Sequence, residues 1–449
     1  MSNRPKKVAF WFTDDLRLHD NLALNWACSH YAAIAFIYVI NPHDVRPHNY
    51  QHKAIGPHRL NFIYQSLCDL DQQLRTLGHR LIILEGQPAT EVCRFMQEQQ
   101  IETIVRSKPV GWYENKACQV IEQNLPDVRC FATWNHTLFK PEQLALTPQL
   151  LNSFSSFRQH IEQHNFAVQA VGDPLSTVPH AIQVQSSQGI SLDQFAQTYV
   201  TQPLAASAFQ GGEQQALAHV QRYFSSSAAH SYKLTRNQLD GWDSSTKFSP
   251  FLALGNLSPR YIWQQLKAYE AQHGANDSTY WIGFELLWRE YFQWSALQQD
   301  ARLFSFQGQA KHKPKTSYYS ARFKKWCNGE TPYPLVNACM KELNATGFIS
   351  NRGRQIVASC LVNELAVDWR YGAAYFQQQL LDYDVACNWG NWQYIAGVGN
   401  DPRGGRHFNL DKQTQEYDPE RRYIKQWQCD TAPQPLDTVD YVDWPIMPE

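Results

Sequence analysis

Hydroxyl side chains and one lysine stand directly before a predicted helix, in the sequence GWDSSTKFSP of residues 241–250. Free N–H groups and the dipole at the start of a helix attract anions. Ser249 as the capping residue and Pro250 as the first helical residue would account for part of this pattern. Capping leaves unexplained the four residues that a pyrophosphate would use, Ser244, Ser245, Thr246 and Lys247.

Two arginines fall in the first turn of a helix that is predicted to start at Ser350 or Asn351. The helix dipole disfavours cations there, so Arg352 and Arg354 are expected to face an anionic group. Gly353 between them costs about 1 kcal/mol of helix propensity relative to Ala, which indicates that another group approaches closely. Exposed arginines that are solvated by water are the alternative interpretation.

A carboxylate, a large ring and a guanidinium share one helical turn at Glu285, Trp288 and Arg289. Glu285 and Arg289 have the spacing of an i,i+4 surface ion pair, which is worth about 0.2–0.5 kcal/mol. The many aromatic residues around this segment favour burial instead.

Carboxylates and amides also stand among aromatic rings in the sequence DYDVACNWGNWQY of residues 382–394. Buried carboxylates need cationic or hydrogen-bonding partners. Arg354 is a natural partner for this segment.

The composition limits the class of protein that can carry these groups. A chain of 449 residues is long enough for two domains, and its net charge of −1 provides no general field for polyanions, so any nucleic-acid site must be local. The ten cysteines show no CxxC spacing and are interpreted as reduced thiols. No apolar run approaches the roughly 18 residues of a membrane helix. The N-terminus leads directly into a strand without a signal peptide, which predicts a cytoplasmic protein.

The first 140 residues alternate between strand and helix patterns, which predicts a doubly wound parallel α/β domain. A helix is expected from Leu60 to Leu77. The turn after the first strand, TDDLRLHDN, lacks the glycines of an NAD or ATP site. The predicted strands are Val8 to Phe12, Ala33 to Ile40, Arg80 to Leu84, Thr103 to Arg106 and Val128 to Phe131.

The rest of the chain divides into three parts. Residues 141–205 are rich in Gln, Ser and Pro with weak periodicity, which predicts a long surface linker containing the domain boundary. From 206 to 430 apolar residues recur at three- and four-residue spacing, which predicts an all-helical domain. The acidic, Pro-containing residues 431–449 are expected to form a short tail.

In these segments the chain resembles the cryptochromes and photolyases, in particular their DASH branch. WFTDDLRLHDN, GWDSSTKFSPFLALGNLSPR, TGFISNRGRQ, LLDYDVACNWGNWQY and AGVGNDPRGGRHFN follow in family order, and the match covers nearly the whole chain outside residues 141–205. The resemblance implies an FAD-binding helical domain and light-driven repair of cyclobutane pyrimidine dimers. A blue-light photoreceptor that regulates through nucleic acid without repair is the alternative, although the short tail argues against it. A helical scaffold that binds nucleic acid without a cofactor is a third interpretation.

The resemblance also assigns the cofactor-binding residues. It implies that the phosphates and ribityl chain of FAD are bound by Tyr232, Thr246, Lys247 and Ser249, with Ser245 and Phe248 beside them. The folded cofactor would lie against Trp288 and Arg289, and Glu285 and Asn351 would also contact it. Arg354 and Asp382 would pair beside the isoalloxazine, Asp384 would accept its N3–H, and Asn388 would face N5. A neutral amide at N5 tolerates the anionic reduced flavin, whereas a carboxylate would resist it.

The dimer-binding pocket, as the resemblance implies it, consists of Glu285, Trp288, Asn351, Arg352, Gln355 and Tyr394, with Asn388 at the flavin. Gln355 and Tyr394 replace the Met and Trp of bacterial duplex-specific photolyases. The less apolar pocket favours single-stranded or looped DNA, whose bases are already unstacked, and RNA is a further candidate. Asn351 occupies the position of a catalytic histidine in (6-4) photolyases, which disfavours that activity. The protein is expected to be a monomer.

Two further assignments concern light and electrons. Trp392 and Trp369 match the inner and middle members of the family's tryptophan chain, but the third position falls near Thr316. Either Tyr318, Tyr319 or Trp326 must then take over, or the electron leaves by another route. Glu114 is the expected contact of a methenyltetrahydrofolate-type antenna, and an exposed glutamate at a helix start is the alternative.

Overall fold

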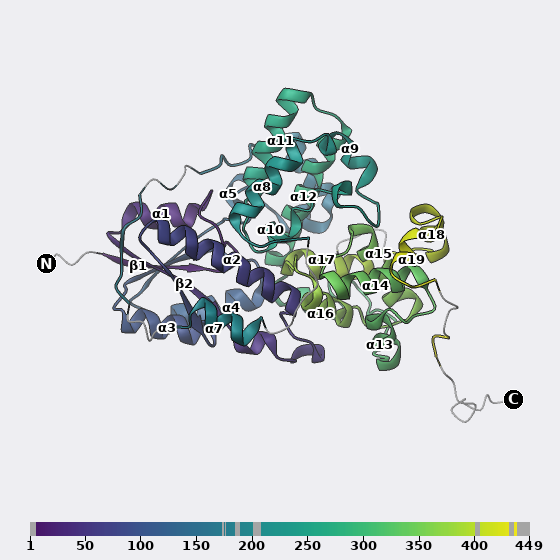
Figure 1. Cartoon of the computed structure of the whole chain (residues 1–449), viewed down its shortest axis with the longest axis horizontal. Coiled ribbons are helices and arrows are strands. Elements are labelled where there is room, and N and C mark those ends of the chain that lie inside the picture. The colour runs from purple at the N-terminus through teal and green to yellow at the C-terminus, as the bar shows by residue number, and fades with distance from the viewer. Residues whose placement is uncertain are drawn as a thin grey trace.

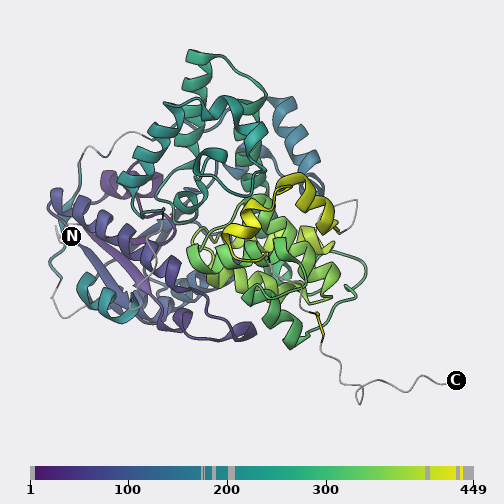
Figure 2. The ribbon, with the colours of Figure 1, turned by 45° about the vertical axis from the view of Figure 1, so that its right-hand side comes forward.

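The protein consists of an α/β domain and a helical domain that lie side by side (Figure 1). The structure is a computed structural model that describes residues 6–172, 175, 177–184, 189–200, 208–399, 405–430 and 435–437. In Figure 1 the helices α18 and α19 lie on the side of the helical domain away from the sheet, and in the turned view of Figure 2 they lie in front of the other helices.

A parallel sheet forms the centre of the α/β domain, with its main strands in the order β3-β2-β1-β4-β5 and β6 paired with β2. Side chains alternate along β1, so that Val8, Phe10 and Phe12 face one core and Ala9 and Trp11 the other. The predicted doubly wound sheet is confirmed. The strands are β1 (Lys7–Phe12), β2 (Ala33–Ile40), β3 (Leu81–Glu85), β4 (Thr103–Ser107), β5 (Arg129–Thr133) and β6 (His180–Ala181).

Helices cover both faces of this sheet. Buried residues of α3 and α4 pack on the face of Ala9 and Trp11, and buried residues of α1 and α2 share the core of the other face. The long helix α2 also contacts α8 and α16 of the helical domain. The helices and 3-10 turns of this part are α1 (Leu22–His30), η1 (Pro42–Val45), η2 (Asn49–Gln51), α2 (Pro57–Thr76), α3 (Pro88–Glu98) and α4 (Trp112–Asn124).

The linker predicted at residues 141–205 contains short helices in its described part. α6 packs against α12 of the helical domain, and α7 packs against α2. The abundance of Gln and Ser gives these helices little apolar periodicity, which is why the sequence did not predict them. They are α5 (Pro141–Leu144), η3 (Pro148–Asn152), α6 (Phe154–His164) and α7 (Leu192–Tyr199).

The second domain is all helical, as predicted, and its described residues contain no strand. Its 23-residue helix α12 contacts α9, α11 and α17. α15 begins where predicted, because the Ser350 hydroxyl accepts the Gly353 N–H at 3.1 Å. The elements are α8 (Glu213–Phe224), α9 (Ala228–Thr235), η4 (Trp242–Ser244), α10 (Ser249–Ala253), α11 (Pro259–His273), α12 (Asp277–Gln299), η5 (Asp300–Phe304), α13 (Ser320–Asn328), α14 (Pro334–Thr346), α15 (Asn351–Ser359), the π-turn η6 (Cys360–Glu364), α16 (Trp369–Gln379), α17 (Val385–Ala396), α18 (Leu410–Tyr417) and α19 (Arg422–Gln426).

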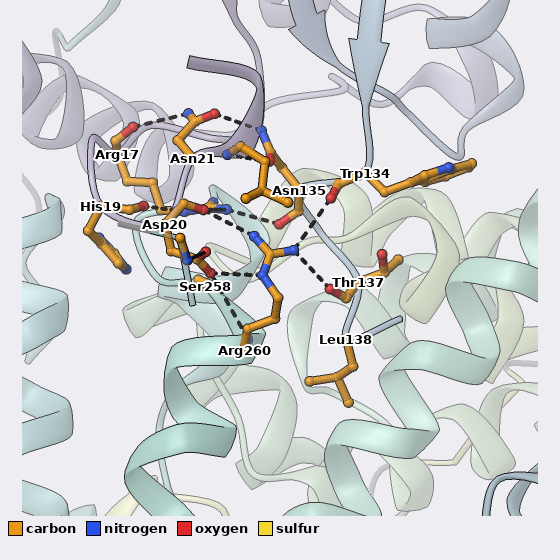
Figure 3. Close-up of polar contacts among 12 residues, drawn as sticks. Arg17, His19, Asp20, Asn21, Trp134, Asn135, Thr137, Leu138, Ser258 and Arg260 are labelled. Atoms are coloured by element: carbon orange, nitrogen blue, oxygen red, sulfur yellow. Dashed lines mark hydrogen bonds and ion pairs between the residues drawn. The ribbon is translucent and has the colours of Figure 1, made fainter. Parts of the chain in front are cut away.

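The turn after β1 joins the two domains (Figure 3). Oδ2 of Asp20 and Nε of Arg260 lie 2.9 Å apart, and both side chains are wholly buried. Arg260 also donates to three backbone carbonyls of the α/β domain. In the other direction, Arg17 donates to the Gly255 carbonyl at 2.8 Å. Gly255 has a φ of 64°, and a Cβ there would lie 2.0 Å from the Asp14 carbonyl oxygen. The turn that lacks nucleotide-binding glycines therefore binds the other domain.

Of the predicted tail, the structure describes residues 435–437, where Asp437 pairs with Arg322 of α13 at 2.5 Å. Among the described residues, no helix combines the length and apolar character needed to span a membrane.

Candidate functional site

The helical domain contains a cavity of about 530 Å³, within the range of about 300–1,000 Å³ that is typical of ligand sites. Its walls come from α9, α10, α12, α15 and α17 and from the segments before α10 and α17. Side chains that the sequence assigned to the cofactor, the dimer pocket and the inner tryptophan all line it. They are Tyr232, Ser245, Thr246, Lys247, Phe248, Ser249, Glu285, Trp288, Arg289, Asn351, Arg352, Arg354, Gln355, Asp382, Asp384, Asn388, Trp392 and Tyr394.

Lys247 supplies a buried cation at one side of the cavity. Its residue is 9% exposed, its backbone is left-handed with a φ of 53°, and Nζ lies 5.2 Å from the centre of the Phe348 ring. No carboxylate in the described part of the chain lies within ion-pair distance of it. Burial lowers the pKa of Lys247, although Glu342 opposes this effect. A phosphate group would provide the missing counter-charge.

Asp382 lies between a hydroxyl and a guanidinium. The Ser249 hydroxyl donates to Oδ2 at 2.6 Å, and Nη2 of Arg354 lies 2.8 Å from the same oxygen. The ion pair was expected from the sequence, but the interpretation of Ser249 as a helix cap is wrong, because Phe248 holds the cap position of α10. Oδ1 of Asp382 is buried and has no partner in the part of the chain that the structure describes, so it remains available to an N–H group of a ligand.

Asp384 caps α17 by accepting the Cys387 N–H at 2.8 Å. The side-chain amide of Gln293 donates to both carboxylate oxygens, at 3.0 and 2.8 Å, and Nη2 of Arg289 lies 3.8 Å away. These contacts fix the carboxylate as an acceptor in the cavity wall. Gln293 was not predicted, since it follows Arg289 by one helical turn inside an apolar stretch.

Asn388 follows one turn later on α17 and is 7% exposed. Its Nδ2 donates to the Ala373 carbonyl at 3.0 Å. This bond sets the orientation of the amide and leaves Oδ1 to accept from a ligand.

Arg236, at the end of α9, forms an ion pair with Glu285. The guanidinium also lies 4.2 Å from the centre of the Trp281 ring. Burial raises the pKa of Glu285, and Arg236 opposes the rise. The interpretation of Glu285 and Arg289 as a surface ion pair is therefore wrong, because Arg289 donates to the His136 carbonyl. Sequence reasoning missed Arg236, whose only local signal is its position one turn after Tyr232.

The two arginines at the start of α15 have different partners. Arg354 has the expected carboxylate, whereas the guanidinium of Arg352 lies 4.8 Å from the centre of the Tyr417 ring. Its Nε is buried without a partner among the described residues. Gly353 is explained by packing, because a Cβ there would lie 3.3 Å from Sγ of Cys339.

Trp288 lies against the linker. Its ring stacks on Phe154, the first residue of α6, with centroids 3.8 Å apart and an angle of 12° between the planes. Tyr394 meets Trp288 edge-on at 6.0 Å, and the guanidinium of Arg406 lies 4.8 Å from the centre of the Tyr394 ring. The linker therefore contributes Phe154 to the packing behind the cavity wall.

Trp392 joins the cavity to a set of buried rings. Its centroid lies 6.1 Å from that of Trp326, whose Nε1 donates to a backbone carbonyl. Trp369 lies 5.8 Å from Trp389. Trp326 and Trp369 are both 0% exposed, so neither can be the member of a chain that faces solvent.

Glu114 lies at the seam between the domains, away from the cavity lining. It stands in the first turn of α4, and Gly111 at the cap of that helix packs against Val385 of α17. Burial raises the pKa of Glu114, and Asp44 adds to the rise. Burial also raises the pKa of Asp14, to about 7, with Glu114 adding to it. Glu114 and Asp14 are nonetheless exposed at the surface of this seam, so a glutamate exposed at a helix start, the alternative interpretation, also describes Glu114.

The parallel sheet, the buried connection to a helical domain and the cavity with cationic and acceptor groups together define a two-domain cofactor-binding protein. The family model for the FAD binding domain of DNA photolyase matches residues 281–443, and the family model for DNA photolyase matches residues 8–179. The chain is 48% identical over 440 residues to Cryptochrome DASH of Idiomarina loihiensis, covering 97% of this chain and 96% of that protein. It is 46% identical to the Vibrio parahaemolyticus protein of the same name, covering 98% of each.

A solved structure agrees with these relatives. The crystal structure of the Synechocystis sp. PCC6803 cryptochrome superposes with a TM-score of 0.90 at 38% identity, covering 97% of this chain and 91% of that one. The chain belongs to the photolyase and cryptochrome family, among the members named cryptochrome DASH. Its helical domain is an FAD-binding domain, and the family carries FAD-dependent, photolyase-like chemistry that uses blue light on DNA.

Proposed function

We propose that the protein repairs cyclobutane pyrimidine dimers in single-stranded or looped DNA. The observation that carries this proposal is that one cavity is lined both by the residues assigned to FAD and by those assigned to the dimer. A substrate in that cavity would lie against the cofactor without intervening protein. When bound and reduced, FAD supplies an electron under blue light.

The chain's own residues would hold the cofactor in a defined orientation. The Lys247 ammonium and the hydroxyls of Ser245 and Thr246 would bind the pyrophosphate, because they combine a buried positive charge with donors. The free Oδ1 of Asp382 would accept an N–H of the flavin ring. Oδ1 of Asn388 would accept from N5 when that nitrogen is protonated.

The substrate end of the cavity supports a single-stranded substrate. Glu285, paired with Arg236, would accept an N–H of a pyrimidine, and Asn351 and Gln355 add neutral polar groups. Trp288 and Tyr394 line this end of the cavity with aromatic rings, and stacking of a base on an aromatic ring is worth about 1–3 kcal/mol. A pocket with this many polar groups gains less from burying a base pair that must first be flipped out at a cost of a few kcal/mol.

The antenna belongs to the seam around Glu114. The pKa of Asp14 is raised to about 7, so this carboxyl can accept or donate a hydrogen bond near neutral pH, and burial also raises the pKa of the neighbouring Glu114. A pterin ring, which carries an amino group and both kinds of ring nitrogen, matches that property. We therefore propose a methenyltetrahydrofolate-type antenna at this seam.

Blue-light repair of an oligonucleotide with one thymine dimer tests the function, using protein whose flavin has been reduced chemically. Repair of the single strand at a higher rate than of the duplex is the expected result. Glu285→Ala and Asn351→Ala should lower repair while the ratio of FAD to protein stays near that of the wild type. Bound flavin without repair of either substrate would favour a photoreceptor, and absence of flavin would refute both.

A further inference from the structure

We propose that electrons enter the protein from solution at a stacked tyrosine pair, Tyr318 and Tyr371, during light-driven reduction of the flavin. The inference rests on the proposed function in one respect, because it takes Trp392 as the ring that gives an electron to FAD. It concerns how the cofactor becomes reduced and not what the reduced cofactor does to DNA.

The two tryptophans beyond Trp392 cannot complete such a path. Trp326 and Trp369 are 0% exposed, and the third tryptophan position that the resemblance implies falls near Thr316. A ring that meets a soluble reductant must be accessible to water. The segment after Thr316 supplies one, because Tyr318 is 43% exposed.

The tyrosine pair is closely stacked. The ring centroids of Tyr318 and Tyr371 lie 4.1 Å apart, with an angle of 16° between their planes. Tyr371 lies in the first turn of α16, two residues after Trp369. Stacking at this distance couples the exposed ring to a partly buried one.

A continuous series of oxidisable rings leads from the pair into the protein. Tyr371 lies 5.0 Å from Tyr50, Tyr50 lies 6.5 Å from Trp389, and Trp389 lies 5.8 Å from Trp369. Trp369 is one turn before Gly372 on α16, where a Cβ would lie 2.3 Å from the Trp392 ring. Gly372 thus packs against Trp392, and Trp369 at the end of the series lies one turn before Gly372 on the same helix.

A second series reaches the same pair but includes a phenylalanine. Trp392 lies 6.1 Å from Trp326, which stacks on Phe323 at 6.0 Å, and Phe323 lies 5.6 Å from Tyr371. Phenylalanine is much harder to oxidise than tyrosine or tryptophan. The path through Trp389 needs no such step, so it is the one we assign.

The electron and proton balance closes with a soluble thiol as the reductant. Each excitation would move one electron from Trp392 to the flavin, and each ring along the series would then refill the one before it, so full reduction takes two such rounds. Tyr318 finally loses one electron to Tyr371 and its phenol proton to water, which leaves a neutral tyrosyl radical. The thiol gives this radical a hydrogen atom and becomes a thiyl radical.

Radical trapping on the full-length holoprotein tests the inference directly. The oxidised protein is illuminated with blue light in the presence of a nitroxide radical scavenger, and adducts are mapped by peptide mass spectrometry. The expected adduct is on Tyr318 in the wild type. Tyr318→Phe should lose it and should also accumulate reduced flavin more slowly with thiol present. An adduct on another ring, or unchanged photoreduction in Tyr318→Phe, would overturn the proposal.

The neighbouring residue provides a matched control. Tyr319 is 45% exposed, and its ring faces the guanidinium of Arg322 at 4.8 Å. Tyr319→Phe should keep both the adduct and the rate of photoreduction. Trp389→Phe should slow photoreduction more than Trp326→Phe, and the reverse order would transfer the path to Trp326. FAD content and melting temperature are measured for each variant, and mapping in the wild type needs no variant.

Chemical reduction separates this inference from the proposed function. Dithionite supplies electrons to the flavin without the ring series, so Tyr318→Phe reduced in this way should repair dimers at the wild-type rate. A reduced wild-type protein that repairs nothing would refute the proposed function and leave the adduct result as it stands.

Discussion

Arg236 and Glu285 form an ion pair at the cavity although they stand 49 positions apart in the chain. In Arg236→Met the carboxylate loses its counter-charge, so the pKa of Glu285 should rise beyond the increase that burial already causes. We expect affinity for dimer-containing single strands to fall by about 1–3 kcal/mol, the cost of leaving a buried polar group unpaired. Fluorescence anisotropy measures the affinity. Arg421→Met, which removes an exposed partner of Asp430, should change nothing.

Lys247 should control how tightly FAD is held. Lys247→Met removes a charged hydrogen-bond donor worth about 1.5–3 kcal/mol, which corresponds to at least a tenfold weaker Kd. Burial lowers the pKa of this ammonium, so FAD should dissociate more readily as the pH rises through the lowered value. Flavin fluorescence released on dilution measures both effects. Lys233→Met serves as the control, because Lys233 pairs with Asp277 on the surface; an equal loss of FAD there would contradict the assignment.

Asn388→Asp should slow accumulation of the fully reduced flavin under blue light. The new carboxylate would face the Ala373 carbonyl, which now accepts from the amide, and it would repel a negative charge on the flavin. Absorbance during illumination gives the rate. Asn391 lies on the same helix and donates to the Cys387 carbonyl, so Asn391→Asp tests whether any added charge on α17 has the same effect. Equal slowing in both variants would remove the special role of Asn388.

Asp20→Asn should destabilise the protein by about 3–5 kcal/mol, because it leaves Arg260 as a buried charge without its partner. Burial favours the neutral acid, but Arg260 and Arg17 lower the pKa of Asp20 below its usual value. The stabilisation is therefore complete at neutral pH and is lost as the pH falls through the lowered pKa. Urea unfolding at several pH values should show the difference between wild type and variant shrinking in acid. Glu420→Gln, at an exposed pair with Arg422, should cost less than about 1 kcal/mol.

Glu114→Ala should remove the antenna and leave FAD in place, since Glu114 lies outside the lining of the FAD cavity. The measurement is the absorption spectrum of protein purified with added methenyltetrahydrofolate. Glu122 on the same helix is half exposed and lies 3.4 Å from Arg106, which makes Glu122→Ala a control for changes in α4 itself. Folate that stays bound to Glu114→Ala would place the antenna elsewhere.

Local sequence patterns were sufficient for the sheet and for the start of α15. The pattern of β1 is an alternation of apolar residues, and α15 is capped by Ser350, which accepts the N–H of Gly353. Both features act on immediate neighbours in the chain, so their effect can be predicted from spacing alone. The cavity residues were found through their order along the chain, which matches a family.

Contacts between distant residues could not be predicted in this way. Arg236 meets Glu285, and Phe154 stacks on Trp288, only because α9, α6 and α12 pack together. Nothing in the short segments around Arg236 or Phe154 marks either residue as part of a site. The role of the turn after β1 could not be predicted for the same reason, because Asp20 in that turn pairs with Arg260, which lies 240 residues later in the first turn of α11.

The buried contacts of Asp20 and Arg260 limit how this protein can be recombined with its relatives. Asp20 of one domain and Arg260 of the other form a buried ion pair, and Gly255 leaves room for one particular backbone path of the first domain. A chimera that joins one half of this chain to the other half of a relative should fold only if both the turn and the start of α11 are compatible.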